Sequence, residues 1–354
     1  MKIRLAILEN DSNYLNRIVN VFTTRFTDRL EVYSFTAEDQ ALGMVQTGRI
    51  DVFLADEAFT INPAAVPKGC GFGYLVESSG IDLFRDQTAV CKYQKPDLIY
   101  RQILSLFSEQ SGNAVVLSQA DESCRVITFT SPAGGCGCST VAAAYAVHEA
   151  NKGRRTLYLN LEKYGTSDVF FNAEGQFTMT DLIFSLKSKK TNLALRLESC
   201  MRQDPSGVFF FAPSRNALDM IDLNAEECGR LISEIKLSGI VDTLVVDVPF
   251  GLDKQTLGLL KNCGYIVLVG DGSETSNNKI HRALSSLQIL EENEKLMILG
   301  RTHILYNKFS NKTGGVIQEY DSITLGGAPK YEHATAKVVM NALSELMVFE
   351  QITF

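Results

Sequence analysis

Residues 126–145 read Val126-Ile-Thr-Phe-Thr-Ser-Pro-Ala-Gly-Gly-Cys-Gly-Cys-Ser-Thr-Val-Ala-Ala-Ala-Tyr145, and this stretch decides the fold of the larger part of the chain. It predicts a buried strand, a glycine-rich turn and the start of an alanine-rich helix, which is the order of elements in a phosphate-binding loop. Backbone N–H groups of Gly134 to Thr140 can surround a polyphosphate, and a helix that begins near Ser139 directs its positive end at the same anion. Such loops carry a lysine that reaches the β- and γ-phosphates, but Cys138 stands at that position here.

The composition is that of a globular chain with a hydrophobic core. A length of 354 residues favours two domains, and 45% of the residues are hydrophobic while 21% are charged. A net charge of −7 disfavours non-specific binding of nucleic acid by the whole surface. We find no signal peptide and no apolar run that could span a bilayer. The eight cysteines, which form no Cys-x-x-Cys pair, are therefore expected to be reduced thiols in a cytoplasmic protein.

Residues 1–112 are expected to form a first domain in which strands and helices alternate. Short apolar runs predict strands at 3–8, 30–35, 51–56, 73–77 and 90–93. Helices are expected at about 12–26, 37–48 and 97–107, with Ser12 as the N-cap of the first. Such alternation predicts a parallel sheet. The stretch 79–88 is short and contains Gly80, so we expect the helix there to be stunted or missing.

The polar residues at the ends of these strands resemble those of response-regulator receiver domains. An acidic cluster at Glu9-Asn-Asp11 follows the first strand, Asp56 ends the third, Ser78 follows the fourth and Lys95-Pro follows the fifth. The resemblance implies that Asp56 is a candidate phosphoacceptor and that Lys95 pairs with its acyl phosphate. Receivers usually have two adjacent aspartates where this chain has Glu9-Asn, and loss of a carboxylate weakens a Mg²⁺ site. We therefore favour an inert receiver-like fold over a phosphorylated regulator.

A linker at residues 113–124 is expected to lead into a second α/β domain, residues 125–354, and residues 114–117 can add a strand. Further strands are predicted at 154–161, 208–211, 242–247, 265–271 and 304–307, with helices at 140–150, 181–186, 225–238 and 335–349.

Two of these strands end in residues that suit nucleotide chemistry. The strand at 242–247 ends in Asp247, whose carboxylate can hold the water shell of a Mg²⁺ bound to nucleotide and to the Ser139 hydroxyl. The strand at 304–307 ends in Asn307, whose amide can both donate to and accept from the N6/N7 edge of adenine.

With these features, residues 125–354 resemble the ParA/MinD family of P-loop ATPases, in which the loop reads Lys-Gly-Gly-x-Gly-Lys-Ser/Thr-Thr. Both lysines are absent here, since Ala133 and Cys138 take their places. Glu162 stands where the family has an aspartate that orients the attacking water, and it is the candidate catalytic residue. The resemblance implies bound ATP, with Mg²⁺ held at Ser139 and Asp247. The nucleotide-binding residues that it implies are Ala133, Gly134, Gly135, Cys136, Gly137, Cys138, Ser139, Thr140, Asn307 and Pro329.

A receiver-like domain fused to such an atypical ParA/MinD-type domain is similar to the TadZ/CpaE group, which belongs to the Tad (Flp, type IVb) pilus assembly machinery. The resemblance implies a cytoplasmic, ATP-binding localisation or scaffold factor, held at a cell pole through the pilus machinery. It also implies a homodimer with other Tad pilus assembly proteins as partners. We expect no specific nucleic acid and no direct membrane insertion, because Lys337 is the one basic residue on the last helix, where Glu345 and Glu350 oppose anionic lipid.

The loss of positive charge at positions 133 and 138 predicts that ATP hydrolysis is absent or very slow, since such charges stabilise the phosphoryl group during transfer. Two alternatives stay open. One is a slow ATPase that cycles between assembly states with Glu162 as its catalytic residue. The other is a response regulator controlled by phosphorylation at Asp56. Without a lysine at position 133 to reach the partner's phosphates, we also expect the homodimer to form without ATP.

Overall fold

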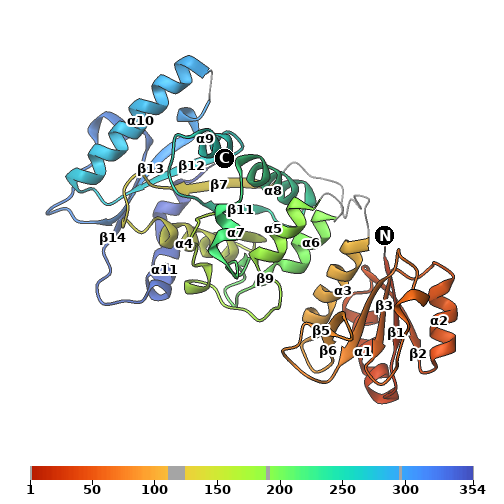
Figure 1. Ribbon diagram of the computed structural model, residues 1–354. Coiled ribbons are helices and arrows are strands. Elements are labelled where there is room, and N and C mark those ends of the chain that lie inside the picture. The colour runs from red at the N-terminus through yellow and green to blue at the C-terminus, as the bar shows by residue number, and fades with distance from the viewer. Residues whose placement is uncertain (1, 111–123, 189–191, 295–296, 354) are drawn as a thin grey trace. The chain divides into compact units, whose positions relative to one another are not determined.

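The chain forms two α/β units, each built on its own sheet, in the computed structural model (Figure 1). The structure describes residues 2–110, 124–188, 192–294 and 297–353. The first unit comprises Met1–Leu117 together with Ser185–Cys200, and the second comprises Ser118–Phe184 together with Met201–Phe354. The linker expected at 113–124 and the strand expected at 114–117 lie outside the described residues, except for Cys124.

The sheet of the first unit has the strand order β2-β1-β3-β4-β6-β5, and every neighbouring pair is parallel except β5 with β6. Its strands are β1 (Ile3–Leu8), β2 (Leu30–Phe35), β3 (Val52–Asp56), β4 (Gly71–Val76), β5 (Leu83–Phe84) and β6 (Gln87–Cys91). Its α-helices are α1 (Ser12–Arg25), α2 (Glu38–Gln46), α3 (Pro96–Gln110) and α6 (Leu193–Cys200). Strands β3 and β4 are buried at every residue, which explains why they read as nearly uninterrupted apolar runs.

Two local features of the first unit bear on the sequence predictions. Between β4 and β6 the chain forms only the two-residue strand β5, so the helix that was expected to be stunted or missing is missing from this stretch. The N-cap of α1 is Asp11 rather than Ser12. One carboxylate oxygen of Asp11 accepts hydrogen bonds from the backbone N–H groups of Asn13 at 2.8 Å and Tyr14 at 3.3 Å. A carboxylate at this position also favours the positive end of the helix dipole.

Helix α6 belongs to the first unit, although it follows β8 and α5 in the sequence. Leu195 is fully buried in the hydrophobic core of this unit. The Arg196 guanidinium donates to the Ser105 hydroxyl of α3, and the Glu198 carboxylate lies 4.0 Å from Arg29. The first unit is therefore completed by a helix that is distant in sequence, and no periodic pattern within residues 1–112 could predict it.

The sheet of the second unit has the order β14-β13-β12-β7-β11-β8-β10-β9, with every pair parallel except β9 with β10. Its strands are β7 (Arg125–Thr130), β8 (Thr156–Asn160), β9 (Arg202–Gln203), β10 (Phe209–Phe210), β11 (Thr243–Asp247), β12 (Tyr265–Gly270), β13 (Thr302–Phe309) and β14 (Thr324–Pro329). Its helices are α4 (Cys138–Asn151), α5 (Met179–Lys187), α7 (Ala217–Ile221), α8 (Ala225–Ser238), α9 (Lys254–Lys261), α10 (Glu274–Glu294) and α11 (Ala336–Ser344), with α5 extending into the first unit.

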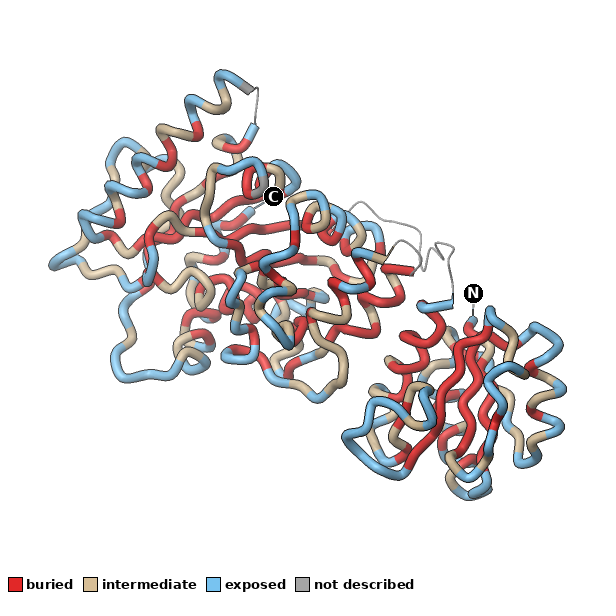
Figure 2. The backbone as a smooth tube through the Cα atoms, in the orientation of Figure 1, coloured by how far each residue is buried: buried red, intermediate tan, exposed pale blue. Residues whose placement is uncertain are grey.

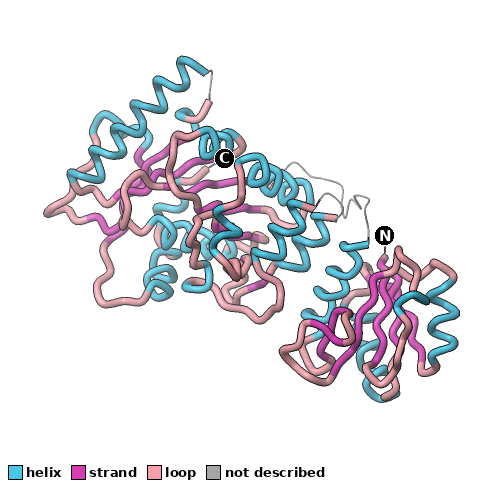
Figure 3. Tube along the Cα trace, viewed as in Figure 1, coloured by secondary structure: helices cyan, strands magenta, loops and turns pink. Residues whose placement is uncertain are grey.

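The central strands of this sheet form the core of the second unit. Helices lie on both sides of the sheet (Figure 3), and the strands between them are buried (Figure 2). Strands β11 and β12 are buried at every residue, as expected for parallel strands covered on both faces. Strand β7 lies between β11 and β12, so the phosphate-loop sequence that follows β7 emerges at the middle of the sheet.

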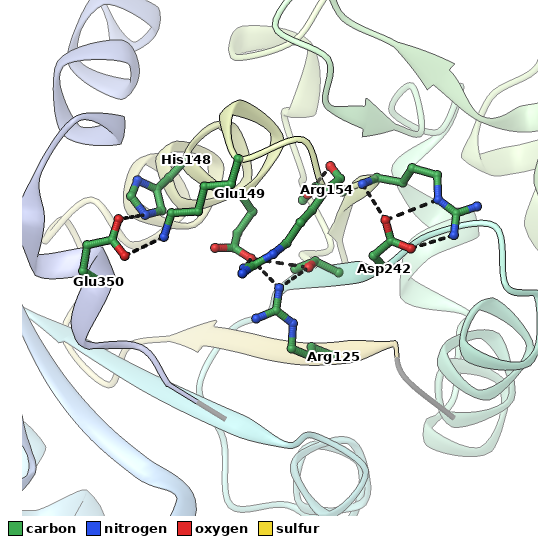
Figure 4. A network of polar contacts seen from close by, with 10 residues as sticks. Arg125, His148, Glu149, Arg154, Asp242 and Glu350 are labelled. Carbon is green, nitrogen blue, oxygen red and sulfur yellow. Dashed lines mark hydrogen bonds and ion pairs between the residues drawn. The ribbon is translucent and has the colours of Figure 1, made fainter. Parts of the chain in front are cut away.

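Helix α4 is held rigidly at the end farthest from the loop (Figure 4). Every residue from Val141 to Glu149 is buried, because small alanine side chains let the helix pack closely on the sheet. The buried Glu149 carboxylate accepts from Arg125 at 2.8 Å and also pairs with Arg154. Beside it, His148 lies 3.4 Å from Glu350 near the end of the chain. These contacts fix the axis of the helix whose other end begins at the loop.

The last predicted helix, 335–349, is two elements in the structure. Helix α11 ends at Ser344, and a short 3-10 helix spans Met347–Gln351. Leu346 between them is extended, which lets Phe349 turn inward against Tyr145 with their ring centroids 5.4 Å apart. Packing against α4 thus overrides the local helical pattern. Neither this segment nor any other helix among the described residues has the length and apolar character needed to cross a membrane.

Leu195→Ala is expected to destabilise the first unit by about 2–5 kcal/mol, because it leaves a cavity in the core that α6 completes. Urea unfolding followed by tyrosine fluorescence and far-UV circular dichroism measures the loss. Leu83→Ala is the control in the same unit, since Leu83 is 65% exposed. Equal stability of the two variants would contradict the docking of α6 in this core.

Candidate functional site

The loop between β7 and α4 has the backbone shape of an anion cradle. Gly135 and Gly137 have φ angles of +80° and +84°, the left-handed region that side chains other than glycine rarely adopt. Helix α4 begins at Cys138 with Gly137 as its N-cap, and no side chain caps it. The N–H groups of the first helical turn are thus not occupied by a capping side chain, and they stand where a phosphate would be bound.

The loop is held from beneath by a buried amide. Asn307 follows Tyr306 in β13, and its Nδ2 donates to the Cys136 carbonyl at 2.8 Å. A Cβ added to Gly137 would stand 2.6 Å from that nitrogen, so the close approach requires glycine. The Oδ1 atom of Asn307 is buried and has no hydrogen-bond partner among the described residues. Pro329, at the end of β14, is exposed and pairs in register with Phe309 of β13.

Asp247 lies at the carboxyl end of β11, almost completely buried with 1% of its surface exposed. Its Oδ2 accepts from the Tyr158 hydroxyl at 2.7 Å and from Asn160 Nδ2 at 3.1 Å. Its Oδ1 has no hydrogen-bond partner in the described part of the chain. Burial, with the charge of Glu162, raises the pKa of Asp247 to about 7, although hydrogen bonds from Tyr158 and Ser139 lower it.

A hard divalent cation fits this environment. A buried carboxylate with one oxygen left unpaired, next to a serine hydroxyl at the start of α4, offers two of the oxygen ligands or water-shell acceptors that Mg²⁺ prefers. Residues Ser139 and Asp247, predicted from separate stretches of sequence, are brought together by the pairing of β7 with β11. The residues present are thus suited to hold Mg²⁺ together with a polyphosphate on the loop.

Glu162 lies on the turn that follows β8. Its backbone N–H donates to Asn160 Oδ1 at 2.9 Å, and its charge acts on Asp247. The turn closes tightly, since a Cβ on Gly165 would stand 2.3 Å from the same Asn160 oxygen. Asn160 therefore connects the Glu162 turn to the Asp247 carboxylate through both ends of its amide.

Two residues of this network, Tyr158 and Asn160, were not predicted as site residues. They are two residues apart in β8, so their side chains point to the same face of the sheet. Asn160 is in register with Asp247 of the neighbouring β11. Period-two spacing in a strand that precedes a candidate acidic turn is the signal that could have identified them.

The two cysteines of the loop are protonated thiols. Cys136 is buried, with its sulfur 3.1 Å from the Ser131 hydroxyl, and burial raises its pKa. Burial and then the charge of Asp247 raise the pKa of Cys138 well above its ordinary value. Neither thiol is therefore a thiolate at neutral pH, and Cys138 supplies no charge in place of the missing lysine.

The first unit holds a second acidic site, and its lysine is not the one predicted. The buried Lys92 ammonium lies 3.0 Å from Glu9 and also contacts Asp56. Although burial favours a neutral amine, hydrogen bonds from Lys92 to Asp56 and Glu9 raise the pKa of Lys92. Lys92 is the first residue past β6, which ends at Cys91, and the pairing of Lys95 with an acyl phosphate on Asp56 stays a prediction. Asp56 is itself buried.

Residues 1–108 match the family described as "TadZ-like, receiver domain". No curated protein matched the chain.

Among solved structures, the chain is similar to a ParA family ATPase from Chlorobium tepidum TLS, with a TM-score of 0.52 and 16% identity over 65% of this chain and 96% of that one. It also aligns with the septum site-determining protein MinD of Pyrococcus horikoshii OT3 in complex with Mg-ADP, with a TM-score of 0.47 and 16% identity over 63% and 95% of the two chains. At such identity the ParA likeness shows the fold alone. The expected receiver domain followed by a ParA/MinD-type P-loop fold is confirmed.

Asp247→Asn is expected to make the nucleotide-free protein more stable at pH 8. The folded-state pKa of about 7 exceeds the ordinary value of 3.8, so the native wild-type protein holds a proton that the unfolded chain loses. The wild-type free energy of unfolding therefore falls between pH 4 and 7, by at most about 4 kcal/mol. The asparagine variant avoids this loss.

Thermal melts at pH 5 and pH 8 measure this difference, with Asp168→Asn as the exposed-carboxylate control. The variant should gain melting temperature over wild type at pH 8 and little at pH 5. A gain of the same size at both pH values would contradict the buried, raised pKa.

Proposed function

We propose that the chain is an ATP-binding scaffold and localisation factor of Tad pilus assembly that hydrolyses ATP very slowly or not at all. The observation that carries the proposal is a loop that keeps its left-handed glycines and uncapped helix start beside a buried, half-paired Asp247, yet has Ala133 and Cys138 at the lysine positions. The glycines, the uncapped helix start and Asp247 suit nucleotide binding, whereas the lysine charges that are missing are the ones that phosphoryl transfer needs.

Nucleotide binding follows from the donors of the loop and the ligands beside it. The N–H groups from Gly134 to Thr140 would surround the phosphates of ATP, while Ser139 and Asp247 would hold Mg²⁺. The bound Mg²⁺ would neutralise part of the phosphate charge. Asn307 within β13 and Pro329 at the end of β14 are the proposed contacts to the nucleotide's base.

Slow turnover follows from the charges that the site lacks. Cations around the transferred phosphoryl group supply much of the rate in this class of enzymes. Alanine and a protonated thiol supply none at positions 133 and 138. Glu162 is the proposed residue for orienting water, and it would carry the activity if the protein is instead a slow ATPase that cycles between assembly states.

The scaffold role rests on the TadZ-like receiver domain and the ParA-type fold. We propose a cytoplasmic homodimer that is held at a cell pole by other Tad pilus assembly proteins, with no specific nucleic acid and no direct membrane insertion. We assign the receiver domain to contacts rather than signalling, because Asp56 is buried and paired with Lys92. Labelling of Asp56 by acetyl phosphate would instead favour the response-regulator alternative.

Calorimetric titration of the full chain with Mg-ATP and Mg-ADP tests the binding proposal. Both nucleotides are expected to bind with one site per chain, since the loop and Asp247 form a single cradle. Binding should weaken in EDTA, because Ser139 and Asp247 then lose the cation that links them to the phosphates. The absence of heat with either nucleotide, together with an unchanged melting temperature, would overturn the proposal.

Size-exclusion chromatography with light scattering tests the dimer. We expect twice the chain mass of 39.1 kDa both with and without Mg-ATP, because Ala133 offers no ammonium to bridge to a partner's phosphates. A monomer in nucleotide-free buffer that dimerises on adding Mg-ATP would show that the nucleotide, and not the protein surface alone, drives assembly.

A further inference from the structure

Lys308 lies at the mouth of the phosphate loop. Its Nζ donates to the Gly135 carbonyl at 2.8 Å, although the two residues are far apart in sequence. A Cβ built on Gly137 would stand 3.4 Å from Lys308 Cε and 3.8 Å from Nζ. The side chain therefore crosses the segment from Gly135 to Gly137, which is the segment whose N–H groups would face a phosphate.

The backbone at Lys308 is unusual in a way that aims this side chain. Its φ angle is +56°, in the left-handed region that costs a lysine on the order of 1 kcal/mol. The register between β13 and β14 shifts between Tyr306 and Phe309, so Lys308 lies within an irregularity of the strand. Bulges of this kind redirect single side chains and occur often beside functional sites.

The chemistry of Lys308 suits an anion. The side chain is exposed, and its ammonium carries three N–H donors, of which the bond to Gly135 uses one. Two carboxylates, those of Asp247 and Glu162, act on the loop at Cys138. A polyphosphate placed beside two carboxylates needs a nearby cation, and the charge of Lys308 already acts on the loop at Cys136.

We propose that Lys308, on the same chain but outside the loop sequence, binds the phosphates of the nucleotide and so contributes charge to nucleotide binding rather than to phosphoryl transfer. The inference rests on the proposed nucleotide binding. Lys308 directly follows Asn307 in β13. Two consecutive residues of one strand therefore contact the loop, the Asn307 amide at the Cys136 carbonyl and the Lys308 ammonium at the Gly135 carbonyl. If the hydrogen bond between Lys308 and Gly135 only stabilised the loop, its loss would weaken the binding of every nucleotide by the same factor.

Calorimetric titrations of the full chain with Mg-ATP, Mg-ADP and AMP separate these roles. Lys308→Met keeps the length of the side chain and removes the charge, so it should weaken Mg-ATP binding by about tenfold or more, Mg-ADP less, and AMP least. Lys308→Arg should restore most of the Mg-ATP affinity. Lys312→Met, a lysine of the same exposed stretch, is the matched control and should stay within about twofold of wild type.

The outcomes are distinct. Failure of the wild-type protein to bind any nucleotide overturns the proposed function and this inference together. Wild-type binding with no change in Lys308→Met, or an equal loss for ATP and AMP, overturns the role of Lys308 alone. If the methionine variant melts early, Lys308→Asn takes its place, because asparagine tolerates the left-handed backbone and also lacks the charge.

Discussion

The parallel pairing of β7 with β11 is the constraint on which the candidate site depends. It sets Phe129 in register with Asp247, so the carboxylate lies at the edge of the sheet from which the phosphate loop emerges. On the other side of β11, β8 places Asn160 in register with the same carboxylate. The sheet thus buries an acid whose pKa rises to about 7, a destabilising arrangement that a bound cation would relieve.

Much of the fold could be predicted because its central strands are apolar runs and its helices follow them in turn. That alternation predicts parallel sheets, whereas the receiver-like and ParA-type assignments came from the resemblance of the loop and strand-end residues to those families. Helix α6 could not be predicted as part of the first unit, since its place depends on Leu195 meeting a core formed by distant sequence. The last helix was predicted to be longer than it is, because the inward turn of Phe349 depends on its contact with Tyr145 of α4.

The candidate site, like the fold, could be predicted from the sequence only in part. The loop glycines, Ser139, Asp247 and Asn307 stand at motif spacing, and the structure brings them together around one loop. The contact of Lys92 with Glu9 and Asp56 was missed, because motif spacing does not show where a strand ends. Lys308 was missed as a loop contact, because only a left-handed backbone carries it across to Gly135. Linear patterns thus predicted candidate residues within each segment, and the fold showed the contacts that are made between segments.

The central claim is that this loop holds ATP without turning it over. Its most direct test is prolonged incubation of the full chain with an equimolar amount of Mg-ATP, followed by measurement of released phosphate and of the nucleotide retained on the protein. Intact ATP is expected to remain on the protein, with released phosphate no higher than in a protein-free control. Sustained, Mg²⁺-dependent phosphate release that Glu162→Ala abolishes would contradict it.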